Sequence, residues 1–146
     1  MAEARFGYAA ALIRLRRYAD ARDYLTEAMR VYPAQVAFAN ALARVLSAAP
    51  DDKVRDGARA AALMQVVVAH LRASDLLETM AMAQAELGQF TEAVRWQKDA
   101  MALAKTSGDN LRLYESRKPC RTPWRPDEAI EFQATSAPQA IQSPNP

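Results

Sequence analysis

The sequence predicts an all-α fold of about three helical hairpins, followed by a short capping helix and a flexible C-terminal tail. The first observation is an internal repeat. Two parts of the chain place alanines at the same spacing, namely Ala9, Ala21 and Ala28, and then Ala81, Ala93 and Ala100. An aromatic residue precedes the middle alanine by three positions in both parts, as Tyr18 and Phe90. A fixed period is typical of stacked units that bury their apolar faces against one another.

The second observation is where the helix-breaking residues lie. Only four glycines occur in the 146 residues, and six of the eight prolines follow Lys118. Because proline interrupts the hydrogen-bond ladder of a helix, we expect one helical domain over residues 2–118. Residues 119–146 are expected to form a proline-rich flexible tail, and Cys120 to Pro146 to be mostly disordered.

The first hairpin is expected over residues 2–35. Its apolar residues follow helical spacing in two runs, Phe6-Ala9-Ala10-Ile13 and Ala21-Tyr24-Leu25-Ala28. The spacing breaks near Arg16 and Arg17, which predicts a turn between two antiparallel helices. Pro33 ends the second helix because a proline beyond the last turn cannot continue it.

The second hairpin is expected over residues 36–73 and departs most from the repeat. Its helices are expected at 36–48 and 57–71, where apolar residues again follow helical spacing. Residues 50–54, Pro-Asp-Asp-Lys-Val, widen the connecting turn. This longer turn accounts for the extra residues between the first and third alanine sets.

The third hairpin, expected over residues 74–107, has the clearest boundaries. Its helices are expected at 75–87 and 91–105. Gly88 suits a left-handed C-terminal cap, and Thr91 suits an N-cap. A turn between the two helices is therefore predicted at Gly88 and Gln89.

A short capping helix is expected within residues 108–118. It begins near Leu111, and its apolar side chains can cover the exposed face of the third hairpin, as terminal elements do in stacked arrays. We expect Leu111, Leu113 and Tyr114 to be the covering residues.

The two alanine-bearing units resemble the tetratricopeptide repeat (TPR) family. Its 34-residue unit has small residues where two helices cross, an aromatic residue after the turn and a closing proline. The first unit matches with Ala9, Tyr18, Ala21, Ala28 and Pro33, and the third with Ala81, Gly88, Phe90, Ala93 and Ala100. Arg16 stands where a turn glycine is usual, and Lys105 replaces the closing proline. The resemblance implies a right-handed superhelical stack of hairpins.

The middle of the chain is also similar to a variant found near the C-terminal ends of long bacterial TPR proteins. The similarity covers residues 38–42 and 49–60. Such arrays commonly end in a short helix with a pattern like that of residues 112–114 and 118–119. Some of these proteins carry a membrane glycosyltransferase region ahead of the repeats. The chain is therefore expected to be either the end of a longer array or a short stand-alone relic.

The charge and hydropathy patterns argue against nucleic acid and membrane. The 19 basic and 17 acidic side chains are interspersed and give a net charge of +2, so no strong positive field would attract nucleic acid. No apolar run approaches the roughly 20 residues of a membrane span, and the first residues do not resemble a signal peptide. We expect no nucleic-acid partner, no membrane insertion by this segment and a cytoplasmic location.

The sequence offers no convincing catalytic or metal-binding set. His70 is the single histidine, and it is expected to be a helix-end residue. Cys120, the single cysteine, falls in the expected tail. Asp51 and Asp52 follow a proline, as is ordinary for a loop. We therefore expect a non-enzymatic protein without cofactor or metal.

The concave surface is the expected site of function. In the TPR family the first helix of each hairpin lines a groove that binds peptides. The corresponding positions here are Phe6, Ile13, Arg14, Asn40, Arg44, Asp75, Glu78, Met82 and Glu86. Apolar side chains mixed with charges of both signs suit an extended or helical peptide. Phe6 and Ala10 stand at two positions of the set with which some members bind a chaperone's C-terminal carboxylate, which disfavours that partner. We expect a scaffold for protein–protein interaction.

Two further functions stay open. The chain also suits a regulatory or substrate-presenting repeat region of a larger glycosyltransferase-like protein. It equally suits a self-association element whose first hairpin pairs with another copy and buries Phe6 and Tyr8.

Residues 117–126 combine four cations, three prolines and one tryptophan, which suits either a docking segment or an unstructured end. Of these two, we expect the unstructured end.

Overall fold

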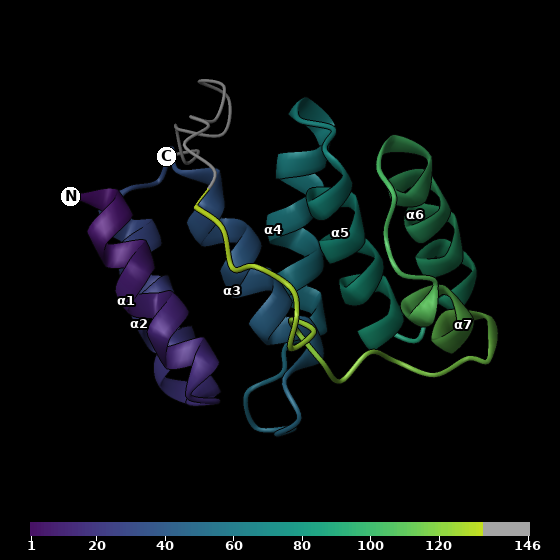
Figure 1. The fold of residues 1–146 in the computed structure, drawn as a ribbon, viewed down its shortest axis with the longest axis horizontal. Helices are drawn as coiled ribbons and strands as arrows, with labels where there is room; N and C mark the ends of the chain where they lie inside the picture. Colours follow the sequence, from purple (N-terminus) through teal and green to yellow (C-terminus); the bar gives the residue numbers. More distant parts are fainter. Residues whose placement is uncertain (133–146) are drawn as a thin grey trace.

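A computed structural model describes residues 1–132, and within that range the chain forms seven α-helices and no strand (Figure 1). The prediction of an all-α fold is confirmed. The helices are α1 (Ala2–Arg14), α2 (Tyr18–Val31), α3 (Val36–Ala48), α4 (Gly57–His70), α5 (Ser74–Glu86), α6 (Phe90–Leu103) and α7 (Asp109–Glu115).

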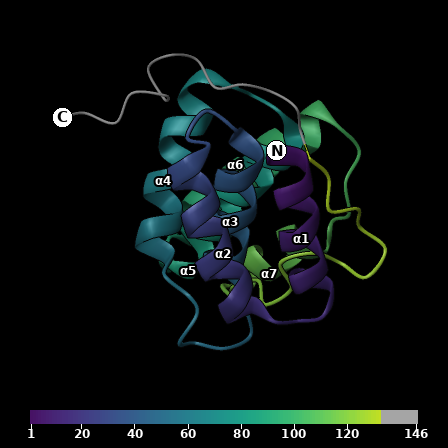
Figure 2. The same ribbon diagram turned by 90° about the vertical axis from the view of Figure 1, so that its left-hand side faces the viewer.

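Each helix packs against the next one along the chain, and α3 also packs directly on α5. In Figure 2, α1 and α4 lie toward opposite sides of the array, and α2 lies between them. The α7 helix packs against α6 at the end of the array. The arrangement leaves α3 between its neighbours, and all of its residues are buried.

The repeated alanines are buried in the core clusters between the helices. Ala9, Ala21, Ala81, Ala93 and Ala100 are 0% exposed, and Ala28 is 1% exposed. A methyl group is the largest side chain that such contacts admit without displacing a helix, since protein interiors are close-packed. The sequence repeat therefore reflects the packing of the helices.

One predicted N-cap is wrong. Thr91 was expected to cap the helix, but α6 begins one residue earlier, at Phe90, and Gln89 is its N-cap without a side-chain hydrogen bond. The α4 helix has a true side-chain cap instead, because the Asp56 carboxylate accepts a hydrogen bond from the Arg59 backbone N–H at 3.0 Å. The cap fixes the start of α4 after the widened turn.

The turns after α5 and α1 share one backbone geometry, although their residues differ. Gly88 has φ +77° after α5, and Arg16 has φ +58° after α1. In each case the next backbone N–H reaches back five residues, from Gln89 to the Gln84 carbonyl and from Arg17 to the Leu12 carbonyl, at 2.9 Å. This pattern is the Schellman motif, which favours glycine at the left-handed position. Arg16 adopts that conformation at a cost of about 1 kcal/mol.

The same substitution should change stability in opposite directions at two glycines. Gly88→Ala should lower the free energy of unfolding by about 1 kcal/mol, because a side chain disfavours positive φ. Gly7→Ala should raise it by about 0.5–1 kcal/mol, because Gly7 is exposed within α1. An added Cβ would meet no heavy atom within 4 Å at either position. Thermal melting followed by circular dichroism measures both effects, and shifts of the same sign would contradict the assigned turn.

Candidate functional site

Residues 119–132, here called the strap, return from α7 across the face that α1, α3 and α5 share (Figure 1). The strap contains neither helix nor strand. The expectation of a flexible tail from residue 119 differs from this structure, because the first part of that tail packs on the helices. Its remainder, residues 133–146, lies outside the described residues.

Arg44 is the central anchor of the strap. Its guanidinium is buried in α3, with 2% of the side chain exposed. The Nη1 atom donates to the Pro123 carbonyl at 3.1 Å and to the Glu128 carboxylate at 2.9 Å. The ring of Trp124 lies over the same guanidinium, with 5.5 Å between the ring centroid and Cζ. A single buried cation therefore binds a main-chain carbonyl, a carboxylate and an aromatic ring of the strap.

The other side of Arg44 is held by α5. Its Nε atom donates to the Thr79 hydroxyl at 3.0 Å, and Nη2 lies 3.5 Å from the Glu78 carboxylate. The Thr79 hydroxyl in turn donates to the Asn40 side-chain oxygen at 2.5 Å. Asp75 lies beside this group, and burial raises the pKa of its carboxyl although the Arg44 cation opposes the shift. These contacts fix the direction in which Arg44 points.

Glu78 is nearly as buried as Arg44 and receives hydrogen bonds from outside α3 and α5. Its Oε1 atom accepts from the Gln97 amide at 3.3 Å and from the Thr106 hydroxyl at 2.9 Å. The Arg125 guanidinium of the strap lies 3.9 Å from the same carboxylate. Because a buried carboxylate needs several partners, Glu78 joins α3, α6 and the strap into one network.

Apolar contacts hold the far end of the strap. The ring of Phe132 lies 5.5 Å from that of Phe6 in α1 and 6.5 Å from that of Phe38 in α3. Trp124 and Ile130 also pack against the main core while staying half-buried. The strap therefore covers Phe6, which would otherwise expose an aromatic side chain on this face.

The near end of the strap is held by burial and by ion pairs. Cys120 is 2% exposed and packs in a small core cluster that includes Tyr114. Its thiol lies 3.3 Å from the Thr122 carbonyl, and burial raises its pKa. The Arg121 guanidinium lies 2.6 Å from the carboxylate of Glu86, which also pairs with Arg55 at 3.1 Å.

The structure places most of the expected groove residues under the strap. Six of them are buried, namely Phe6, Ile13, Asn40, Arg44, Glu78 and Met82. Asp75 and Glu86 are half-buried, and Arg14 is exposed. Met82 differs in its surroundings, because it packs in the cluster with Tyr114 and Cys120. Phe6, expected to be open for self-association, is 4% exposed.

Residues 117–126 were named as a possible docking segment, but an unstructured end was expected there. Four further residues of this site were not predicted, namely Thr79, Glu128, Ile130 and Phe132. Their signal was weak, because an extended segment has no periodicity that sets it apart from a disordered one. One hint was present: Glu128 follows the basic stretch within a few residues of Trp124. A carboxylate and an aromatic ring that lie close together in the sequence can both contact one buried arginine side chain, as Glu128 and Trp124 contact Arg44.

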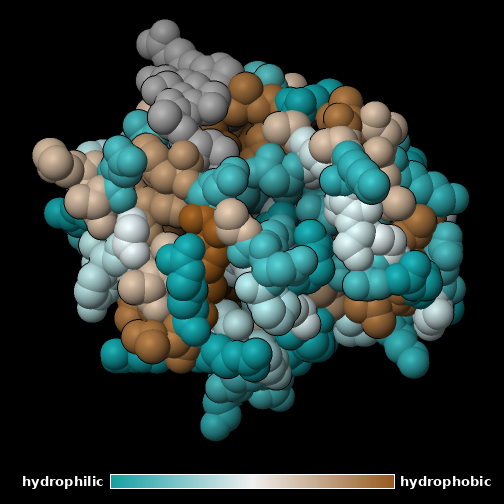
Figure 3. Space-filling view, in the orientation of Figure 1, coloured by the Kyte–Doolittle hydropathy of each residue, from teal (hydrophilic) through white to brown (hydrophobic). Residues whose placement is uncertain are grey.

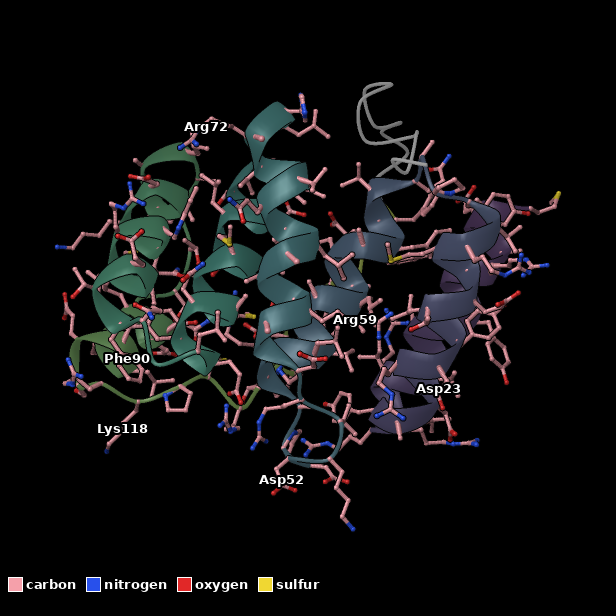
Figure 4. All side chains as sticks on the ribbon, turned by 180° about the vertical axis from the view of Figure 1, so that it is seen from behind. Asp23, Asp52, Arg59, Arg72, Phe90 and Lys118 are labelled. Carbon is pink, nitrogen blue, oxygen red and sulfur yellow. The ribbon has the colours of Figure 1, made fainter. Side chains whose placement is uncertain are left out.

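The remaining candidates for chemistry stay apart. His70 is the last residue of α4 and is exposed. Asp52 lies in the loop that projects from the array (Figure 4), and the Asp51 carboxylate accepts from the Lys53 backbone N–H at 2.9 Å. Within residues 1–132, no group of three or more His, Cys, Asp or Glu side chains is placed to hold a metal ion. In the same range, no helix combines the length and apolar composition needed to cross a bilayer.

Comparison of the chain with protein-family models, curated proteins and solved structures finds no match. The function must therefore be inferred from the groove and the strap themselves.

Cys120 should react slowly with a thiol reagent in the folded protein. A buried thiol with a raised pKa offers little thiolate and little access. Its rate with Ellman's reagent should be at least about tenfold below that of an exposed thiol. The control is Ser116→Cys in a Cys120→Ser background, because Ser116 is exposed and close in sequence. Equal rates for the two thiols would show that the strap is not packed in solution.

Proposed function

We propose that this chain is a non-enzymatic protein-interaction scaffold, in which TPR-like hairpins form a right-handed superhelical stack whose concave face binds an extended protein segment. The observation that carries the proposal is the strap itself. A non-helical segment lies on the expected face and is held at its centre by the buried cation of Arg44. The strap then acts as an intramolecular occupant of the groove.

The contacts suit recognition of a peptide. The Pro123 carbonyl is a main-chain group, which any peptide offers, whereas Glu128 and Phe132 supply side-chain selectivity. Extended peptides are commonly recognised in this way, by backbone hydrogen bonds together with pockets for particular side chains. The expected partner is an extended segment with an acidic residue placed between apolar or aromatic residues.

The incomplete packing of the strap on the helices favours its replacement by such a partner. A cavity of about 210 Å³ remains between the strap and the helices, lined by Asn40, Arg44 and Trp124 among others. Trp124, Ile130 and Phe132 are each only half-buried. Incomplete packing forgoes dispersion contacts, so a segment that fills this cavity would compete with the strap. Figure 3 shows that the face also carries many hydrophilic side chains, which suits a wet, reversible interface.

An exchange experiment tests the proposal with the full chain. A fluorescent peptide of residues 119–132 is titrated into the wild-type protein and into Glu128→Gln, and binding is followed by anisotropy. The substitution removes the ion pair with Arg44 in the chain's own strap, so the open population rises and the added peptide binds more tightly. Weakening the strap by about 1.4 kcal/mol would raise the apparent affinity about tenfold.

The matched control is Asp127→Asn, because Asp127 is exposed and adjacent to Glu128. It should bind the peptide like the wild type. A peptide that itself carries the Glu128→Gln change should bind the Glu128→Gln chain more weakly than the natural peptide. Equal binding of a scrambled peptide, or no binding to the Glu128→Gln chain, would refute a peptide-binding groove.

A further inference from the structure

A cleft lies where the strap passes the end of α1. Its volume is about 300 Å³. One wall consists of residues at and just after the end of α1, including Arg14, Arg16 and Tyr18. The other wall belongs to the strap and includes Arg121 and Arg125. The cleft is thus complete only when the strap lies on the helices.

The charges that line the cleft are unbalanced. Four arginines line it, whereas Glu128 is the one acid among the lining residues. The strap arginines have partners, because Arg121 pairs with Glu86 at 2.6 Å and Arg125 lies 3.9 Å from Glu128. Glu128 itself is shared with Arg44. The acids present therefore do not neutralise the cations of the cleft.

Arg14 and Arg16 carry the excess charge. Both are exposed, and in the described part of the chain neither side chain has a hydrogen bond, ion pair or ring contact. Arg16 also occupies a left-handed backbone position at which glycine would be less strained. Two unpaired guanidiniums line the cleft together with two strap arginines, and such a set of donors suits a negatively charged ligand.

The cleft also has apolar and aromatic lining residues. Among them are Tyr18, Trp124, Ile13 and Ile130. A guanidinium binds phosphate or carboxylate oxygens in pairs, and the aromatic and aliphatic side chains suit a small apolar group. We infer that this cleft binds an oxyanion, phosphate or carboxylate, that is joined to a small aromatic or aliphatic group.

Calorimetric titration of the full chain tests the site, with phenyl phosphate, benzoate and inorganic phosphate as probes. Phenyl phosphate or benzoate should bind more tightly than inorganic phosphate, and the tighter of the two identifies the oxyanion. Arg14→Gln and Arg16→Gly should each weaken that binding by about tenfold or more, as expected for loss of a charge-assisted hydrogen bond. Absence of binding by both phenyl phosphate and benzoate would overturn the inference.

Two controls distinguish binding at the cleft from nonspecific charge attraction and from a loss of stability. Arg17→Gln removes a neighbouring exposed cation that does not line the cleft, and it should leave binding unchanged. Arg16→Gly should raise the melting temperature while binding is lost, because glycine suits the left-handed turn. A loss of binding with Arg17→Gln as large as with Arg14→Gln would show nonspecific charge attraction and overturn the site. The peptide-exchange experiment changes neither Arg14 nor Arg16, so failure of the peptide groove and failure of this cleft can be told apart.

Discussion

The buried guanidinium of Arg44 is the constraint on which this structure depends. A charge removed from water is tolerated only when oxygen atoms replace the lost hydration. Here α5 supplies Glu78 and Thr79, and the strap supplies the Pro123 carbonyl and Glu128. Leaving a buried charge without its partner costs about 3–5 kcal/mol. The strap is therefore part of the electrostatic balance of the core.

Under the proposed function, this constraint gives the face beneath the strap two roles. The same residues that would bind a partner also complete the core when the strap lies on them. Phe6 illustrates this, because it packs on Phe38 at 6.0 Å on one side and on Phe132 on the other. Displacement of the strap without a substitute would expose Phe6 and leave Arg44 with fewer acceptors. A competing segment must accordingly bring both an apolar group and a carboxylate, which makes the face selective.

The helical part of the fold was predictable because its signals are local. Small residues such as Ala21 and Ala93 repeat at fixed positions within short stretches of sequence. This spacing predicts that they are buried between helices, as they are in the structure. The strap was not predictable in that way. Glu128 meets Arg44 across 84 residues of sequence and Pro123 meets it across 79. Proline-rich composition suggested disorder, yet prolines also favour the extended conformation that a covering segment needs.

The arginine cleft and the groove are linked through the strap. Arg121 and Arg125 reach the cleft only from the closed strap, whereas Arg14 and Arg16 belong to the helical body. An anion that bridges the two sets binds the closed form in preference to the open one, and by reciprocity it makes opening less favourable. A peptide in the groove acts in the opposite direction, since it requires the strap to leave. Binding of an anion in the cleft and binding of another protein in the groove would therefore oppose each other. Both depend on whether residues 119–132 lie on the helices.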